Sequence, residues 1–192
     1  MFEDLITSKT RIKILHLFFG HIEEMFHVRE IVRRVDEEIN AVRRELILLE
    51  KKGILNREAR ANRVYYSLNT SYSFYYDLIK IYAKEAGLGR DIVKNKAKLG
   101  RIKYAMLSGD FVRNIDNNGD KVDLLVVGIV VLPELSLIIK REEEVKKREI
   151  NYTIMNEDEF NFRKSRRDPF ISSIIHGSRV MLIGDEETLV KD

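Results

Sequence analysis

The sequence predicts an α+β fold in which an N-terminal helical module with a β-hairpin is joined by a helical connector to a small α/β domain. Three observations favour this. Apolar residues in the first half recur at helical spacing and then alternate after Gly53. Short apolar runs in the second half are separated by segments of helical periodicity. The chain of 192 residues, 44% of them hydrophobic, is long enough for two packed domains. We expect the parts to span residues 1–70, 71–102 and 103–192.

The composition excludes several classes of protein. The chain has no cysteine, so a disulfide framework and thiolate zinc sites are excluded, and four histidines are too few for a histidine-rich metal site. The N-terminus lacks the basic and apolar regions of a signal peptide. The longest apolar run, residues 124–132, is too short to span a bilayer. We therefore expect a cytoplasmic protein with no membrane partner and no cofactor.

The positive charge is gathered into two stretches. The chain has a net charge of +3 and a pI near 9.0. Residues 43–63 contain seven bases against three acids, and residues 80–103 contain eight bases against two acids. Such clusters are compatible with a nucleic-acid partner.

Three helices are expected in the first domain. Ser8 is placed to cap a helix that ends at Gly20. A second helix fits residues 28–35. A third fits residues 39–52 and stops at Gly53, a residue that commonly follows a helix C-terminus.

The third helix has two different faces. Ile39, Val42, Leu46 and Leu49 recur at spacings of three and four, which predicts a core-facing stripe. The other face combines basic and amide side chains with one isoleucine. Arginine and asparagine can bond purine edges and an aliphatic side chain can contact a thymine methyl, so this face suits base reading. Its residues are Asn40, Arg43, Arg44, Ile47 and Lys51.

The segment "ILNREARANRVYYSL" predicts a hairpin. Apolar residues flank a polar turn expected at residues 57–62. Arg57, Arg60 and Arg63 make its tip basic. Three helices followed by a basic hairpin are typical of a winged helix-turn-helix, in which the third helix enters the major groove and the wing contacts the DNA backbone.

The stretch "FHVREIVRRVDEEINAVRRELILLEKKGIL…NRVYYSLN" resembles the winged helix-turn-helix of ArsR-type transcriptional regulators. The resemblance covers the first seventy residues. It implies that Asn40, Arg43 and Arg44 lie on the recognition helix and Arg57, Arg60 and Arg63 on the wing. Without cysteine, metal sensing is not implied. Two alternatives remain open: the charged helix face is merely solvated, or the module binds protein instead of DNA.

The connector predicts self-association. Its apolar helical face carries Phe74, Tyr75, Leu78, Ile79 and Tyr82. A helix leaving a winged domain often pairs with its twin, and twofold DNA half-sites favour a dimer, so we expect a homodimer. Gly87 and Gly89 are expected to end this helix, and a basic helix is expected over residues 91–99.

The second domain is expected to alternate strands and helices. Pro133 is suited to the first turn of a helix, and Asn156 with Glu159 forms a plausible helix cap. The expected strands are 104–107, 122–127, 150–155 and 180–183, and the expected helices are 134–148, a short one around Phe160, and 169–175.

The stretch "LSGDFVRNIDNNGDKVDLLVVG" resembles the core of a minimal nucleotidyltransferase domain. In that family a strand ends in Gly-Ser and the next carries Asp-x-Asp, and a third carboxylate follows on a later strand. The resemblance implies that these carboxylates hold a divalent metal that bridges nucleotide phosphates. Here Gly109, Arg113 and Asp123 match the pattern, whereas Asp110 replaces the serine and Lys121 the first aspartate. Asn114 replaces a glycine, and the strand "EINYT" offers Asn151 or Glu149 for the third acid.

A lysine ammonium cannot ligate a metal and disfavours a cation close by. We therefore expect no catalytic residue and no metal site, only a possible nucleotide-binding remnant at Gly109, Asp110, Arg113 and Asp123.

The leading interpretation is a transcriptional regulator that binds double-stranded DNA, with an inactive second domain that takes a small ligand or a protein partner. One alternative is a magnesium-dependent, antitoxin-like nucleotidyltransferase that modifies protein or RNA. Another is a pair of protein-interaction modules.

Overall fold

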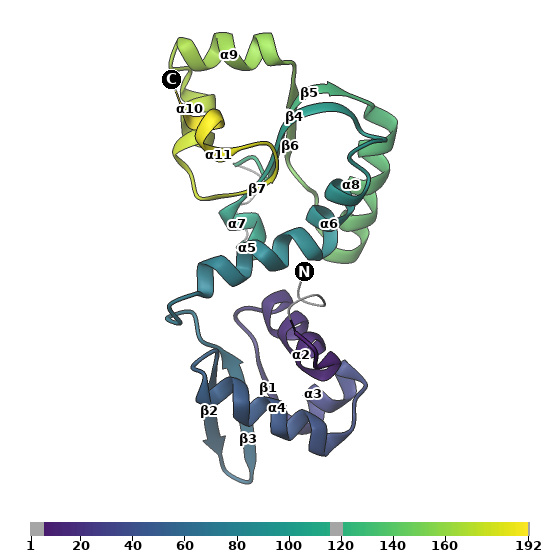
Figure 1. Ribbon diagram of the computed structural model, residues 1–192, viewed down its shortest axis with the longest axis vertical. Coiled ribbons are helices and arrows are strands. Elements are labelled where there is room, and N and C mark those ends of the chain that lie inside the picture. Colours follow the sequence, from purple (N-terminus) through teal and green to yellow (C-terminus); the bar gives the residue numbers. More distant parts are fainter. Residues whose placement is uncertain (1–5, 116–120, 192) are drawn as a thin grey trace. The chain divides into compact units, whose positions relative to one another are not determined.

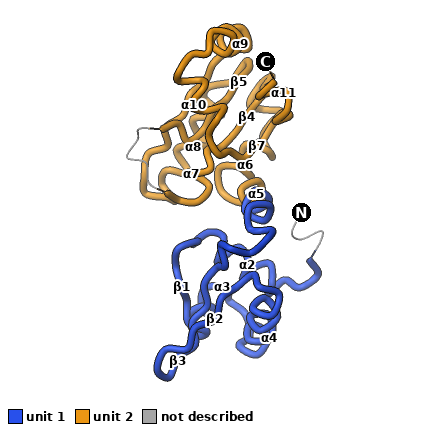
Figure 2. Tube along the Cα trace, turned by 90° about the vertical axis from the view of Figure 1, so that its left-hand side faces the viewer, with its two compact units in different colours: residues 1–82 blue, residues 83–192 orange. Residues whose placement is uncertain are grey.

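The computed structural model describes residues 6–115 and 121–191. The chain contains helices and two small β-sheets, which confirms the α+β class (Figure 1). It divides into two compact units, Met1–Tyr82 and Ala83–Asp192 (Figure 2). The expected connector, residues 71–102, is shared between these units. Residues 116–119, whose sequence Asp-Asn-Asn-Gly predicts a turn, lie outside the described residues.

The helices of the first unit follow the capping signals of the sequence. They are α2 (Lys9–Gly20), α3 (Val28–Val35) and α4 (Ile39–Lys51), each within one residue of its predicted bounds. The hydroxyl of Ser8 accepts a hydrogen bond from the amide of Arg11, which satisfies a free N–H of the first turn of α2. Gly53 follows α4 with φ +77°, a conformation that glycine adopts without strain.

The first unit has a three-stranded antiparallel sheet in the order β1-β3-β2. Its strands are β1 (Met25–His27), β2 (Leu55–Arg60) and β3 (Arg63–Leu68). The hairpin is confirmed, but the turn expected at residues 57–62 is wrong. The strands continue to Arg60 and Arg63, and only Ala61 and Asn62 lie between them. The polar residues belong to β2, an edge strand whose residues after Leu55 are all exposed. Because neither face of this part of the strand is buried, its sequence lacks the alternation of apolar and polar residues that indicates a strand.

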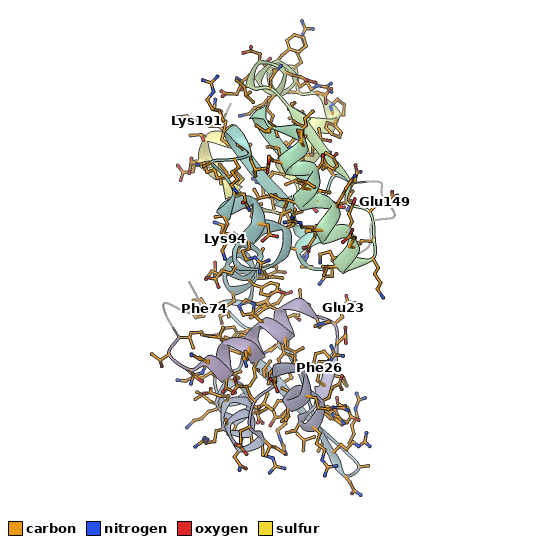
Figure 3. All side chains as sticks on the ribbon, turned by 90° about the vertical axis from the view of Figure 1, so that its right-hand side faces the viewer. Glu23, Phe26, Phe74, Lys94, Glu149 and Lys191 are labelled. Atoms are coloured by element: carbon orange, nitrogen blue, oxygen red, sulfur yellow. The ribbon has the colours of Figure 1, made fainter. Side chains whose placement is uncertain are left out.

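The core of the first unit is aromatic and aliphatic. Phe18 and Phe26 are buried and meet edge to face, with their ring centroids 5.6 Å apart. Helix α5 (Tyr75–Glu85) buries Tyr75 and Ile79. Phe74 precedes the helix and remains 59% exposed, in contrast to Phe26 (Figure 3). The predicted apolar face is therefore only partly used for packing.

The second unit has a four-stranded sheet in the order β6-β5-β4-β7. Strands β4 and β5 are antiparallel, as are β4 and β7, whereas β5 and β6 are parallel. A parallel pair needs a crossover, and helix α8 supplies it. The strands are β4 (Gly100–Ser108), β5 (Leu124–Val130), β6 (Tyr152–Met155) and β7 (Arg179–Ile183), and the helices that follow them are α7 (Gly109–Val112), α8 (Leu132–Lys146), α9 (Glu157–Ser165), α10 (Pro169–His176) and α11 (Glu186–Val190).

The basic helix expected at residues 91–99 is wrong in its bounds. Helix α6 runs over Gly87–Lys94 and includes both glycines that were expected to end a helix. A Cβ atom on Gly89 would lie 1.8 Å from the carbonyl oxygen of Ala83. Gly89 therefore allows α6 to approach the end of α5 closely. The connector helix α5 does end at Glu85, two residues before Gly87, as expected.

Helices lie on both sides of the second sheet (Figure 1). One face buries Tyr104, Met106, Leu125 and Val127 against α9, α10 and α11, whose contacts include Phe160. Helices α6 and α8 lie on the opposite side (Figure 1). Fully burying one such large apolar side chain is worth about 1.5–3 kcal/mol, so these layers hold the unit together. Within residues 6–115 and 121–191, no helix is both long and apolar enough to cross a membrane.

Candidate functional site

The residues predicted to contact DNA are all exposed. Five lie on α4 and three on the β2–β3 hairpin. Ile47 is 59% exposed, although Val42, Leu46 and Leu49 on the same helix are buried. The two faces expected of this helix are thus present. The exposed set is Asn40, Arg43, Arg44, Ile47, Lys51, Arg57, Arg60 and Arg63.

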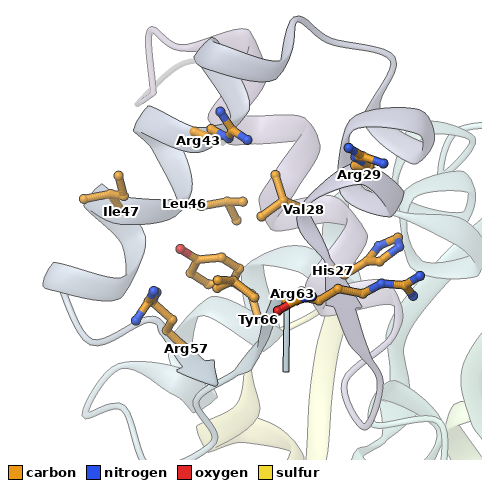
Figure 4. Close-up of a pocket in the computed structure, with 11 residues that line it drawn as sticks. His27, Val28, Arg29, Arg43, Leu46, Ile47, Arg57, Arg63 and Tyr66 are labelled. Atoms are coloured by element: carbon orange, nitrogen blue, oxygen red, sulfur yellow. The ribbon is translucent and has the colours of Figure 1, made fainter. Parts of the chain in front are cut away.

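Four of these residues meet at one depression, which we call the α4–hairpin depression. Its volume is about 550 Å³. Arg43 and Ile47 come from α4, and Arg57 and Arg63 come from the hairpin. Arginines surround a central group formed by Val28, Leu46 and Tyr66 (Figure 4). Asn40, Arg44, Lys51 and Arg60 do not line it, and the remaining lining residues are His27, Arg29, Asn62 and Val64.

His27 and Arg29 join this surface although they were not predicted to do so. His27 caps α3, because its Nδ1 atom accepts a hydrogen bond from the amide of Glu30 at 3.0 Å. In the neutral ring the proton therefore lies on Nε2, which can donate to a ligand. Strand β1 pairs with β3 and brings the start of α3 beside the hairpin. The position of His27 directly before the predicted helix 28–35 was the sequence feature that could have indicated its role as a helix cap.

The arginines differ in their pairing. Arg60 Nε donates to Glu58 Oε1 at 2.6 Å, and this hydrogen bond lowers the pKa of the Glu58 carboxyl. Arg43 and Arg63 form no ion pair with another described residue. Their charges are therefore available to an anionic partner, whereas the charge of Arg60 is balanced within the hairpin.

Tyr66 forms an aromatic floor in the α4–hairpin depression. It is only 4% exposed, and burial raises the pKa of its hydroxyl above the ordinary value, while the charge of nearby Arg57 acts in the opposite direction. The hydroxyl therefore stays protonated at neutral pH and can donate a hydrogen bond.

In the second unit, Gly109 serves close packing. Its amide donates to the carbonyl of Ser178 at 2.6 Å. A Cβ atom at this position would lie 2.1 Å from the Ser178 hydroxyl oxygen. Ser108 caps the short α7 that follows, accepting from the amide of Phe111. The space that a side chain at position 109 would fill is thus occupied by Ser178, directly before β7, and does not leave room for a phosphate.

Asp110 is held between two cations. Lys121 Nζ lies 2.9 Å from Asp110 Oδ2, and Arg113 Nη2 lies 3.0 Å from Oδ1. The hydrogen bond from Lys121 lowers the pKa of the Asp110 carboxyl, and the contact with Arg113 adds to the effect. Lys121 therefore neutralises the charge of Asp110. In the pattern of the nucleotidyltransferase resemblance, Lys121 stands at the position of the first metal-binding aspartate and Asp110 at the position of the serine.

Asp123 is a buried carboxylate with protein partners. It is 2% exposed. Its Oδ2 atom accepts from the amide of Asn151 at 3.1 Å, and its Oδ1 atom lies 3.7 Å from Arg148 Nη2. Asn151 also donates from its side chain to the carbonyl of Lys121. A buried charge is costly unless it is paired, and the Arg148 guanidinium supplies the opposite charge, although its buried Nη2 atom has no hydrogen-bond partner among the described residues.

Neither unit offers a preformed metal centre among the residues described. No group of three or more histidine, cysteine, aspartate or glutamate side chains there is placed to hold a metal ion. Comparison of the chain with models of protein families, with curated proteins and with solved structures finds no match. Function is therefore inferred from the geometry of the two surfaces.

Proposed function

We propose that the protein is a DNA-binding transcriptional regulator whose first unit acts as a winged helix-turn-helix. The observation that carries this proposal is the convergence of Arg43, Arg57 and Arg63, from α4 and the hairpin, on one concave surface (Figure 4). The order of three helices and a hairpin supports it. In such a module α4 enters the major groove while the hairpin follows the backbone.

The charge and exposure of this surface suit a polyanion. Arg43 and Arg63 have no ion-pair partner among the described residues, so phosphates can replace their hydration without first breaking a salt bridge. Ile47 is exposed beside them and can contact a thymine methyl. The surface thus combines groups for backbone contact with groups for base reading.

The test is duplex binding by Arg43→Ala, Arg63→Ala and the double variant. Duplexes are first selected from genomic fragments with the unmodified protein, and affinity is then followed by fluorescence anisotropy at several salt concentrations. Each lost phosphate contact should reduce the slope of log K against log salt by about 0.9. The double variant should bind at least about tenfold more weakly, a loss of about 1.4 kcal/mol.

The matched control is Arg166→Gln, which removes one positive charge from an exposed arginine of the second unit. It should leave duplex affinity unchanged. Unchanged affinity and salt dependence in the double variant would reject the interface. Failure of the unmodified protein to bind any duplex at low salt would favour a protein-interaction role.

We infer that the regulator acts as a homodimer, because operator half-sites are commonly related by twofold symmetry. Phe74 and Tyr76, at the start of α5, are 59% and 60% exposed and supply apolar surface for a second copy. Sedimentation equilibrium should show a dimer for the unmodified chain and a monomer for the Phe74→Ser, Tyr76→Ser variant. A monomeric unmodified chain at micromolar concentration would contradict the inference.

For the second unit we propose a scaffold without nucleotidyl transfer. A metal held by Asp123 and Asp110 would have to displace Arg148 from the first and Lys121 from the second. Magnesium would be needed only for the transferase alternative. That alternative predicts transfer of labelled nucleoside monophosphate with magnesium or manganese, and loss of the transfer in Asp123→Asn.

A further inference from the structure

A second depression lies in the second unit, at the end of α9, along α10 and beside α11; we call it the α9–α11 depression. Its volume is about 410 Å³, within the range of small-molecule sites. None of the residues assigned above to DNA or to the nucleotidyltransferase resemblance contributes to it. Its lining residues are Lys164, Arg167, Ile171, Ser172, Ile175, His176 and Val190.

The floor of the α9–α11 depression is aliphatic. Ile171 and Ile175 are 1% and 8% exposed and belong to the core beneath the sheet. Val190, from α11, contributes a third aliphatic side chain and is 40% exposed. The described lining contains no phenylalanine, tyrosine or tryptophan ring on which a nucleobase could stack. The floor therefore fits an aliphatic chain.

The polar groups at the depression favour a negative charge. Lys164 Nζ donates to the carbonyl of Lys191, which holds the ammonium group between α9 and the end of α11. His176 Nδ1 donates to the carbonyl of Ser172 at 2.7 Å, because a carbonyl can only accept. The Ser172 hydroxyl and the guanidinium of Arg167 add donors, and the described residues of the lining include no carboxylate.

The backbone of Arg167 has a conformation that is unusual for a residue with a side chain. Its φ is +51°, in the left-handed region where glycine is favoured after a helix. Its amide donates to the carbonyl of Lys164 at 2.9 Å and closes α9. Asp36 and Lys147 follow helices in the same left-handed region. Glycine would close α9 with less strain, so Arg167→Gly removes the side chain without disturbing the backbone.

We propose that the α9–α11 depression binds a small aliphatic carboxylate. The carboxylate head accepts hydrogen bonds from Lys164, Arg167 and the Ser172 hydroxyl, and the chain lies over Ile171 and Ile175. An arginine fork matches the two oxygens of a carboxylate, which makes this head group suitable. The site does not depend on DNA binding by the first unit, so it can be tested separately.

Isothermal titration of the full chain with sodium octanoate tests the proposal. We expect saturable binding of one octanoate per chain with a dissociation constant of about 1 mM or tighter. Acetate, which lacks the chain, and octanol, which lacks the charge, should each bind at least about tenfold more weakly. Octyl phosphate binding in place of octanoate would overturn the carboxylate assignment, and absence of octanoate binding would overturn the site.

Two variants connect binding to Arg167. Arg167→Gly should melt at the same temperature or higher, because it relieves the left-handed strain, yet bind octanoate at least about tenfold more weakly. Arg166→Gln is the matched control, because Arg166 lies over the ring of Phe162 at 5.0 Å and does not line the depression. Octanoate affinity should be unchanged in the control. Equal affinity in Arg167→Gly and the unmodified chain would overturn the proposal.

Discussion

Arg60 and Glu58 form a two-point ion pair on β2. Arg60 Nε donates to Glu58 Oε1 at 2.6 Å, and Arg60 Nη2 donates to Oε2 at 3.1 Å. The pair lies at the exposed end of the hairpin, where Arg60 was expected to contact DNA. Because the pair satisfies both charges, the positive charge that the hairpin offers to the proposed DNA partner comes mainly from Arg57 and Arg63.

Glu58→Ala should therefore strengthen duplex binding. Removing the carboxylate frees Arg60 for a phosphate, and one added contact should steepen the slope of log K against log salt by about 0.9. Anisotropy titrations over a range of salt concentrations measure this. Glu157→Ala, which removes the partner of Lys103 in the second unit, is the control and should change neither value. No gain in Glu58→Ala would mean that Arg60 does not reach the DNA.

Ile47→Ala should reduce the recognition of thymine. The side chain is 59% exposed, so its truncation should change the free energy of unfolding by less than about 0.5 kcal/mol. The unmodified protein should bind a selected duplex more tightly than the same duplex with deoxyuridine in place of thymidine, which lacks the methyl group. In Ile47→Ala this difference should shrink. A difference of the same size in both proteins would contradict base contact by Ile47.

Lys121→Met should show the pH dependence of the Asp110 pair. The folded-state pKa of Asp110 is lowered, chiefly by the hydrogen bond from Lys121. The pair therefore stabilises the fold above the unfolded carboxyl pKa of about 4 and loses this effect as pH falls through the lower folded value. Denaturant unfolding should show Lys121→Met about 0.5–1 kcal/mol less stable at neutral pH and nearly equal at about pH 2. Lys140→Met, on the exposed side of α8, should show no such pH dependence.

Gly109→Ala should destabilise the second unit. The added methyl group would overlap the Ser178 side chain, and overpacking of this kind costs about 1–3 kcal/mol. Adding Ser178→Gly should recover part of the loss, because it removes the nearest atoms. Thermal unfolding of the single and double variants measures both effects. If Ser178→Gly brought no recovery, the contact with Ser178 would not be the reason for glycine at position 109.

Local signals in the sequence predicted much of the fold. Ser8 and Asn156 cap the helices that were expected to follow them, because a cap depends on residues three apart. Strand β1 was missed because it spans only three residues and is defined by pairing with β3, far along the chain. The contribution of Arg29 to the α4–hairpin depression depends on the same long-range pairing.

The sequence indicated the exposure of the charged residues of the candidate site better than their pairing. Glu58 and Arg60 are two residues apart and share one face of a strand, so their pairing could have been expected. It was missed because residues 57–62 were interpreted as a turn. The contact between Lys121 and Asp110 joins residues eleven apart through the fold of the second unit, and no local pattern indicates it.

The ion pairs of Lys121 and Arg113 with Asp110 also restrict which side chains fit at position 121. Substituting aspartate at position 121 would place a second carboxylate two residues before Asp123. The same mutation would leave Asp110 facing a new negative charge with one cation fewer, and like charges close together repel. An acidic residue at position 121 would thus be tolerated only together with a change at position 110, so the two positions are coupled through this ion pair.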